Sequence, residues 1–306
     1  MTNFTIINTN ARSLCPKMNS LIDCVRETDA RLAIVTETWL KDGPDMEEEV
    51  QDLSAGAGLG MIARNRRTRA VNGNTYGGVA VLWREGLLGL REYKRSNPEG
   101  FEVLTATGVL KGHSRKVGVI ACYIPPNYTK ARADDALEFI ADTVVELKRK
   151  FKDPYLIIGG DFNQWPIADG LLDFPDLTEA DAGPTRNNRS IDRLFTNMGR
   201  SVTESGTLAP LETDDGQARS DHRVVFCKIQ LARKESFVWQ TYTYRHYCEE
   251  AVKQFKEWIV LHDWQKCTML KARTRKRRRT RTPSPEHSTG SFLPRQPGKK
   301  VPTCRG

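Results

Sequence analysis

The segment Tyr155 to Trp165 reads Tyr-Leu-Ile-Ile-Gly-Gly-Asp-Phe-Asn-Gln-Trp. Its short aliphatic run ends abruptly at Gly159-Gly160, which predicts a buried strand that runs into a tight loop. The two glycines allow another backbone or a ligand to approach closely. If the extended geometry persists, Asp161 and Asn163 face the same way and Phe162 points into the core. The alternative is an ordinary turn pair, because Asp and Asn are favoured in turns.

Apolar patterns on both sides of this segment predict further elements. Strands are predicted at Phe4–Ile7, Leu32–Val35, Gly77–Trp83, Val103–Leu110, Lys116–Ile124, Ile191–Thr196, Val202–Leu208 and Arg223–Leu231. Helical spacing is found in Met18–Val25, in Leu137–Phe151 and in Cys248–His262. The acidic, glycine-rich stretch Asp42–Gly60 is predicted to be a loop. Strands early and late with helices between them favour sheets covered by helices over a single doubly wound repeat.

The positive charge of the chain is concentrated near its end. The chain has 306 residues, which is sufficient for one large α/β domain or two small ones. Its formal net charge is +9. Thr268 to Gly306 holds 12 Lys and Arg and one acidic residue, whereas the rest of the chain holds 35 basic and 37 acidic residues. The body is therefore nearly neutral, and the high isoelectric point belongs to the tail.

A basic block lies within this tail. Its members are Lys271, Arg273, Arg275, Lys276, Arg277, Arg278, Arg279 and Arg281. We expect the block to bind nucleic-acid phosphates or to direct nuclear import, the alternative being an inert solvated segment. Pro283 to Gly306 is rich in Pro, Ser, Thr and Gly, so we predict that it is disordered.

Cysteine spacing and hydropathy favour a soluble intracellular protein. The seven cysteines are dispersed singly, which argues for reduced thiols and against a disulfide scaffold or a cysteine zinc site. Apolar runs are shorter than a membrane span, and Met1 to Ile7 lacks the features of a signal peptide. We therefore expect no membrane partner.

Polar and ionisable residues follow the predicted strands throughout the body. They are Asn10, Glu37, Tyr123, Asp161, Asn163, Asp192 and the adjacent pair Asp221-His222. Taken singly, Glu37 would be interpreted as a loop carboxylate or a helix cap, and His222 as a structural histidine. Tyr123 would be interpreted equally as a packed aromatic or as a site residue. Together they predict one rim where loops converge. Carboxylate oxygens suit Mg²⁺, and a carboxylate that orients an imidazole suits metal-assisted phosphodiester hydrolysis better than acyl transfer.

The ordered motifs resemble those of the endonuclease/exonuclease/phosphatase superfamily. The motifs are Asn10, Glu37-Thr38-Trp39, Tyr123-Ile-Pro-Pro-Asn127, Gly160-Asp-Phe-Asn163, Ser190-Ile-Asp192 and Ser220-Asp-His222. Within that superfamily the chain most resembles the apurinic-endonuclease-like domain of non-LTR retrotransposons. The Asn-Ala-Arg-Ser-Leu start and the Thr-Glu-Thr-Trp-Leu segment are especially similar.

The resemblance implies an α/β (α+β) fold, a four-layer sandwich of two packed β-sheets flanked by helices. The catalytic domain would span residues 1–231, an aromatic and helical connector 232–267, and the basic tail 268–306. Matched residue by residue, Glu37 and Asn10 would hold a divalent metal, Mg²⁺ or alternatively Mn²⁺, and Asp221 would complete the metal or substrate contacts. Asp161 would align or deprotonate the attacking water.

The remaining roles that the resemblance implies concern the phosphate. Asn163 would contact it, Tyr123 would lie beside it, and Asp192 would orient His222 to stabilise its oxygens. The implied activity is a nuclear DNA endonuclease that nicks duplex DNA and leaves a 3′-hydroxyl, with other element-encoded proteins or RNA as further partners. Two alternatives stay open: an abasic-site repair nuclease or other phosphoesterase, and a catalytically inactive nucleic-acid-binding module.

Overall fold

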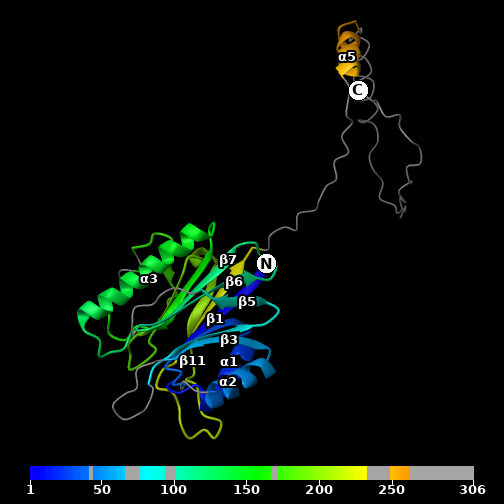
Figure 1. Ribbon diagram of the computed structural model, residues 1–306. Helices are drawn as coiled ribbons and strands as arrows, with labels where there is room; N and C mark the ends of the chain where they lie inside the picture. Colours follow the sequence, from blue (N-terminus) through cyan, green and yellow to red (C-terminus); the bar gives the residue numbers. More distant parts are fainter. Residues whose placement is uncertain are drawn as a thin grey trace, which may run out of the picture. The chain divides into compact units, whose positions relative to one another are not determined.

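Two six-stranded sheets pack face to face in the first of the two units into which the chain divides, Met1–Phe237 and Val238–Gly306 (Figure 1). The computed structural model describes residues 1–40, 44–65, 76–93, 101–166, 171, 173–232 and 249–261. The first sheet has the order β11-β12-β1-β2-β4-β3, with bounds Val202–Leu208, Val224–Leu231, Thr2–Asn10, Ala30–Thr36, Val79–Arg84 and Leu59–Arg64. The second has the order β5-β6-β7-β8-β10-β9, with bounds Leu88–Glu92, Glu102–Leu110, Lys116–Tyr123, Tyr155–Asp161, Asp192–Thr196 and Thr178–Glu179.

Strand β1 shows how the sequence joins the two sheets. Phe4 and Ile6 alternate into the buried cluster between the sheets, whereas Ile7 packs on the opposite face. Asn8 donates from Nδ2 to the carbonyl oxygens of Gly160 (3.1 Å) and Arg193 (3.2 Å) in the second sheet. The inter-sheet face of β1 is thus apolar at its start and polar at its end, which brings Asn10 to the other sheet.

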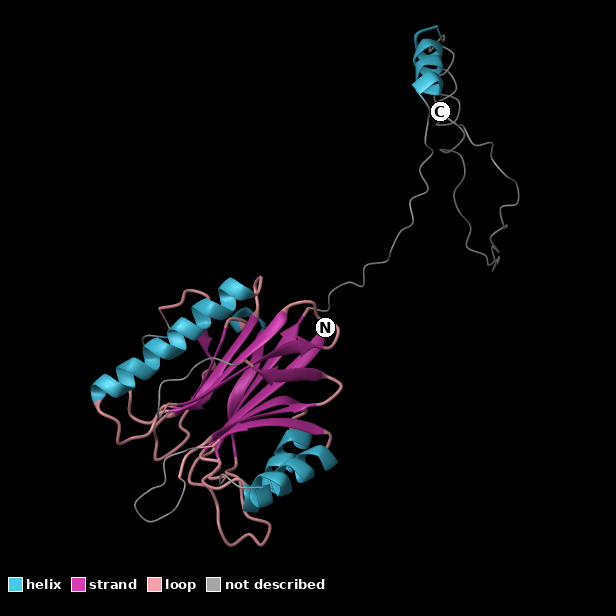
Figure 2. Cartoon of the chain, in the orientation of Figure 1, coloured by secondary structure: helices cyan, strands magenta, loops and turns pink. Residues whose placement is uncertain are grey.

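Helices cover the two outer faces, so the predicted four-layer sandwich is confirmed (Figure 2). Helices α1 (Met18–Glu27) and α2 (Pro44–Gly56) bury their apolar residues on the first sheet. Helix α3 (Lys130–Lys150) buries Ala136, Ile140 and Val144 on the second. The Thr129 hydroxyl caps α3 by accepting from the Arg132 backbone N–H (3.3 Å).

The prediction of a loop over Asp42–Gly60 is wrong, because most of this stretch is α2. Its glycines suggested a turn, yet Pro44 and the following acidic residues suit the first turns of a helix. Val50 is fully buried in the same cluster as α1, with Leu53 packed against it. Tertiary packing of this short apolar stripe outweighs the weak local signal.

Strands β3, β5 and β9 were not predicted from the sequence. β3 pairs only with β4, β5 only with β6, and β9 only with β10, so all three are edge strands. They are short and partly exposed, and their hydrophobic alternation is correspondingly weak. The nine predicted strands, the Tyr155–Gly160 run included, are all present, with ends shifted by a few residues.

Helix α5 (Glu249–Leu261) in the second unit confirms the helix predicted over Cys248–His262. The aromatic residues Trp239, Tyr242 and Tyr244, the basic block and the remainder of the tail lie outside the described residues. Among the residues that are described, no helix combines the length and the apolar character needed to cross a bilayer.

Candidate active site

Six of the predicted site residues meet where strands of both sheets end. Asn10, Tyr123 and Asp161 are the last residues of β1, β7 and β8, and Glu37 directly follows β2. Asp161 is opposite Tyr123 in the parallel register and opposite Asp192 in the antiparallel one. His222 lies just before β12, beside β1. The predicted convergence of loops at one rim is therefore observed for these residues.

Asn10 connects the two halves of this group. Its Nδ2 donates to Glu37 Oε1 (2.8 Å) and to Asp161 Oδ2 (2.9 Å), and its Oδ1 accepts from the Arg12 backbone N–H (3.0 Å). Tyr123 donates from its hydroxyl to the same Glu37 oxygen (2.9 Å). Asn10 is fully buried, so these bonds fix Glu37 and Asp161 relative to one another.

Asp192 and His222 form a buried pair. His222 Nδ1 lies 2.7 Å from Asp192 Oδ2, and both side chains are almost fully enclosed. Thr185 Oγ1 accepts from the backbone N–H of Asp192 (3.1 Å), and Ser220 Oγ joins the loop to β1 by donating to the Asn10 carbonyl (2.7 Å). The imidazole is therefore oriented by a carboxylate, as expected from the sequence.

Burial and charge change the acidity of these groups. Burial, with the charge of Asp192, raises the pKa of Asp161 to about 7, although His222 and the Asn10 hydrogen bond oppose the shift. Burial lowers the pKa of His222, but the hydrogen bond and charge of Asp192 outweigh it and raise the pKa overall. Burial and the charges of Glu37 and Asp161 raise the pKa of Tyr123, so its phenol stays protonated.

Asp221 lies beside His222 but faces two arginines. Its carboxylate is 3.1 Å from Arg12 Nη1, 2.6 Å from Arg186 Nη2 and 3.8 Å from His222 Nε2. Burial would raise the pKa of Asp221, but these three positive partners lower it overall. Its assignment as a metal or substrate contact stays a prediction.

Asn163 differs from the extended geometry considered above. Its φ is +50°, and its Nδ2 donates to the Ile124 carbonyl (2.9 Å), while its backbone N–H donates to Asp161 Oδ1 (2.8 Å). The chain therefore turns directly after Asp161, since Asn tolerates the left-handed region. Phe162 is fully buried, as expected, and Trp165 packs at the rim with its indole N–H on the Pro125 carbonyl (3.0 Å).

Gly159 and Gly160 lie where the chain has no room for side chains. A Cβ on Gly159 would approach Ile34 Cδ1 of the other sheet to 2.8 Å, and a Cβ on Gly160 would overlap the Cys122 carbonyl. The close approach inferred from the sequence is confirmed at both positions. At Gly159 the absence of a side chain allows the first sheet to pack closely against β8, two residues before Asp161.

The donor set fits a divalent cation. Asp161, Asp192 and His222 each offer a ligand atom, and these atoms lie within 4.8 Å of one another. Among the described residues, Asp192 Oδ1 is buried and has no hydrogen-bond partner, which is costly for a carboxylate oxygen without a cation or donor. Glu37 adds a further carboxylate beside Asn10. Oxygen-rich sites of this kind suit Mg²⁺ or Mn²⁺.

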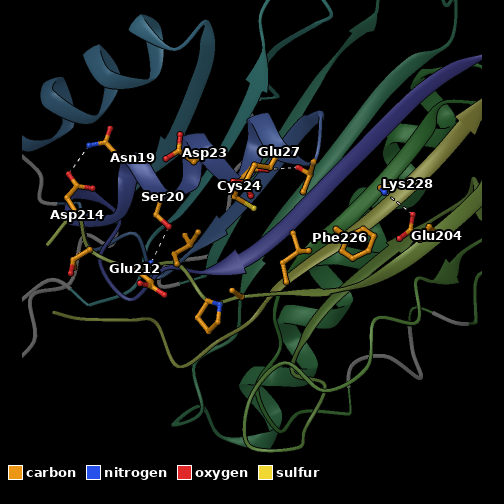
Figure 3. A pocket seen from close by; sticks show the side chains of 16 residues that line it. Asn19, Ser20, Asp23, Cys24, Glu27, Glu204, Glu212, Asp214, Phe226 and Lys228 are labelled. Carbon is orange, nitrogen blue, oxygen red and sulfur yellow. Dashed lines mark hydrogen bonds and ion pairs between the residues drawn. The ribbon is translucent and has the colours of Figure 1, made fainter. Parts of the chain in front are cut away.

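A separate cavity of about 740 Å³ lies between α1, β11, β12 and the 209–214 loop (Figure 3). Five carboxylates line it, whereas Lys228 is its single basic residue and is paired with Glu204 (2.8 Å). Such a surface repels a phosphate backbone. A smaller cavity of about 280 Å³ adjoins the candidate active site and contains Arg186, Asp221 and Arg223.

Several residues of the site were not identified from the sequence. Arg12 and Arg186 hold Asp221, while Thr185 and Ser220 position the Asp192–His222 pair. Arg12 and Ser220 lie inside the quoted motifs and could have been named from them. Thr185 and Arg186 lie in a polar loop that offers no periodic signal. The predicted nucleic-acid-binding residues of the basic block are outside the described part of the chain.

The model of the endonuclease/exonuclease/phosphatase family matches residues 3–222, which is most of the chain and includes every residue of this site. The chain belongs to that family. Its members are metal-dependent hydrolases that act on phosphoester bonds. No curated protein matches the chain.

Solved structures of low sequence identity share the family fold. A family member from Bacteroides vulgatus has a TM-score of 0.59 at 11% identity, covering 76% of this chain and 100% of the other. A 3′ phosphatase from Neisseria bound to a product DNA hairpin has a TM-score of 0.54 at 16% identity, covering 74% and 100%. The endonuclease domain of TRAS1, a telomere-specific non-LTR retrotransposon, has a TM-score of 0.49 at 16% identity, covering 75% and 99%. These likenesses concern the fold alone.

Proposed function

We propose that this family member is a Mg²⁺-dependent DNA endonuclease of the retrotransposon type, which nicks one strand of a duplex and leaves a 3′-hydroxyl. The observation that carries the proposal is the linked pair of carboxylate groups. Asn10 joins Glu37 to Asp161, and Asp161 faces the Asp192–His222 pair across β8 and β10. This arrangement supports the proposal, because carboxylates and an imidazole that could serve as base, charge-stabilising group and metal ligand lie around one position at the rim.

Asp161 is the proposed acceptor of the proton from the attacking water. A pKa of about 7 suits a general base near neutral pH, and the bonds from Asn10 and Asn163 fix both of its oxygens. The water oxygen attacks phosphorus as its proton passes to Asp161, the bond from phosphorus to O3′ breaks, and the O3′ atom takes up a proton from solvent water. The products are a 3′-hydroxyl and a 5′-phosphate.

His222 is proposed to stabilise the charge on the phosphate oxygens. Its raised pKa favours the imidazolium, and Asp192 accepts from Nδ1. Nε2, which lies 3.8 Å from Asp221 Oδ1, is the nitrogen that would donate to a phosphate oxygen, and in this protonated state the ring is not a metal ligand. Glu37 and Asn10 would hold the divalent metal, which when bound neutralises phosphate charge and favours formation of the nucleophile. Tyr123 fixes the Glu37 carboxylate by donating to it.

DNA as the substrate and the retrotransposon type rest on the quoted motifs. Asn10–Leu14 and Thr36–Leu40 resemble the non-LTR endonucleases more than other family members. The two segments are hydrogen-bonded side by side, through Ala11 N to Thr36 O (2.9 Å) and Ser13 N to Glu37 O (2.9 Å). They therefore form one continuous edge of the site, at which target DNA would lie. We further propose residues 1–231 as the catalytic domain and the basic block as a nuclear import or DNA-binding element.

A plasmid assay tests this proposal. With Mg²⁺ the protein should convert supercoiled plasmid to the nicked circle, and the new ends should support extension by a DNA polymerase, which requires a 3′-hydroxyl. Asp161→Ala and His222→Ala should each lower the nicking rate by at least about 100-fold. Asp23→Ala, in the acidic cavity away from the site, is the matched control and should nick like the wild type.

Substrate comparisons separate the alternatives. Preference for an abasic duplex over an intact one would indicate a repair nuclease, and hydrolysis of small phosphate esters alone would indicate a phosphoesterase. DNA binding without turnover under Mg²⁺ or Mn²⁺ would indicate a catalytically inactive module. Equal nicking by the two active-site variants would place the activity elsewhere.

A further inference from the structure

Tyr76 is an exposed aromatic residue close to the candidate active site. Its side chain is 38% exposed, and among the described residues up to 232 it is the one aromatic side chain that is more than a third exposed. Tyr123, by contrast, is 8% exposed and engaged with Glu37. A single exposed aromatic ring is ordinary on a protein surface, so it is the position of Tyr76 beside the site that is informative.

Hydrogen bonds to the next two residues place Tyr76 at the rim. Trp39 donates its backbone N–H to the Gly77 carbonyl (2.9 Å), and Thr38 donates to the Gly78 carbonyl (3.3 Å). Thr38 and Trp39 directly follow Glu37, the proposed metal ligand. The Tyr76 ring meets the Trp39 ring edge-on, with centroids 4.9 Å apart at 81°.

Hydrogen bonds and tight packing hold the two glycines that follow Tyr76. Gly78 donates its N–H to the buried Glu102 carboxylate, and Glu102 pairs with Tyr123 in the strand register. Gly77 and Gly78 have φ values of +101° and +88°, and a Cβ on Gly77 would overlap the Glu102 carboxylate. The two residues that follow Tyr76 are therefore anchored to Glu102 and to the Thr38–Trp39 segment.

We propose that Tyr76, supported by Trp39, stacks against a nucleobase of the bound DNA next to the scissile phosphate. This inference rests on the proposed DNA endonuclease function and adds a residue that positions the substrate. In a duplex each base face is covered by its neighbours, so the contact requires one base next to the nick to unstack. The aromatic ring then covers the exposed π-face of that base, and substitution by alanine removes this contact. Because the contact is made away from the reacting atoms, its loss should raise KM and Kd more than it lowers kcat.

The test combines variants of Tyr76 with base deletions in the DNA. Tyr76→Ala should raise Kd for duplex DNA about 5- to 100-fold, since a stacked base contributes about 1–3 kcal/mol. Tyr76→Phe and Tyr76→Trp should retain affinity, and Tyr76→Leu, which keeps apolar bulk, should not. Val109→Ala is the matched control, because Val109 is 40% exposed at the opposite end of β6 from Glu102. Its affinity should equal that of the wild type.

A base deletion identifies the stacked nucleotide. In a series of duplexes that each lack one base near the nick, the wild type should lose affinity at one position, and Tyr76→Ala should show no further loss there. Equal losses in both proteins at every position, or an unchanged Kd for Tyr76→Ala with a preserved melting temperature, would overturn the inference. The Kd measured without metal decides it even if the wild type fails to nick, whereas that failure would reject the proposed function.

Discussion

Asp161 occupies the least favourable position for a charge among the residues of the site. It is 1% exposed, and Asp192 lies opposite it on the neighbouring strand. Burial and that charge raise its pKa to about 7, while Asn10 and Asn163 stabilise the ionised form only in part. A buried charge that lowers the stability of the fold is typical of residues retained for activity.

The acidity of Asp161 and His222 gives the metal-free protein a predicted pH dependence of stability. Both groups have folded-state pKa values above their unfolded ones, so the folded state binds more protons. Their contribution is present at low pH and is lost as the pH rises, for Asp161 from about 4 to about 7 and for His222 from about 6.5 upward. Chemical denaturation in EDTA should therefore give a lower free energy of unfolding at pH 8 than at pH 6.

Asp161→Asn should remove much of this dependence. The amide carries no buried charge, which more than offsets the loss of one of the two hydrogen bonds that the carboxylate oxygens accept from Asn10 and Asn163. At pH 8 the variant should therefore be more stable than the wild type by on the order of 2 kcal/mol. Asp176→Asn, on an exposed side chain, is the control and should leave the curve unchanged. A variant that is inactive and also less stable at pH 8 would contradict the cause assigned here.

Asp192→Asn should lower the pKa of His222. The carboxylate supplies both a hydrogen bond and a charge to the ring, and without it burial dominates. Titration of the His222 ring by NMR in the metal-free protein measures this directly. Glu204→Gln, a charge change distant from the ring, should leave that titration where it is. An unshifted His222 in Asp192→Asn would mean that the pair does not set the charge of the imidazole.

Predictability at the residue scale depended on ordered motifs. Asn10, Glu37 and Asp161 were identified because each ends or directly follows a strand, and His222, which precedes β12, because of its place in the ordered Ser-Asp-His motif. The direction of Asn163 could not be predicted, since a left-handed φ directly after a strand leaves no periodic signal. The ion pairs of Asp221 depend on Arg12 and Arg186, which are far apart in the sequence.

At the scale of elements, the turn before β4 holds the segment after β2. Gly78 has a φ of +88°, and a Cβ there would lie 2.5 Å from Thr38 Oγ1. Gly86 has a similar φ of +74° but open space around its Cβ position. The two glycines therefore separate the cost of backbone conformation from the cost of a steric clash.

Gly78→Ala should be markedly more harmful than Gly86→Ala. The left-handed backbone alone costs about 1–2 kcal/mol in either variant. Displacement of Thr38 should add to this in Gly78→Ala, and because Glu37 is adjacent, the nicking rate should also fall by at least about 10-fold. Thermal melting and plasmid nicking measure the two effects. Equal behaviour of the two variants would show that the turn does not position Glu37.

Elements were predicted where their apolar patterns were long. Helix α3 follows a regular spacing over Leu137 to Phe151, and central strands such as β8 are continuous apolar runs. Helix α2 was missed because its buried face consists of only a few residues, such as Val50. These residues are buried by packing in the same cluster as α1, which the local sequence does not reveal. The edge strands β3, β5 and β9 contain too few buried residues for an alternation of apolar and polar residues to be visible.

At the scale of the whole molecule, charge is separated along the chain. Residues 1–267 hold 35 basic and 37 acidic residues, and residues 268–306 hold 12 basic residues and one acidic residue. Binding to the DNA backbone releases counterions for each phosphate that is neutralised. The tail should therefore supply affinity without sequence preference, and the loops around Asp161 should set where the strand is cut.

Deletion of residues 271–306 should weaken DNA binding nearly uniformly across sequences. The slope of log affinity against log salt should become shallower by several units, at about −0.9 for each lost contact, while the nick position stays the same. Deletion of residues 283–306 alone, which spares the basic block, should have a smaller effect on the slope. If the salt dependence of affinity were unchanged after the longer deletion, nuclear import would remain as the function of the tail. If the nick position moved, the proposed division between a tail that supplies affinity and loops that set the cleavage position would be contradicted.

The metal dependence of nicking tests the central claim most directly. The rate on supercoiled plasmid should be zero in EDTA and rise with Mg²⁺, and Glu37→Gln should need about 10- to 100-fold more metal for half-maximal rate, as expected for loss of a ligand contact. Glu212→Gln, in the acidic cavity, should follow the wild-type curve. Nicking that persists in EDTA, or identical metal curves for Glu37→Gln and the wild type, would contradict a metal-dependent hydrolase site built around Asn10, Glu37 and Asp161.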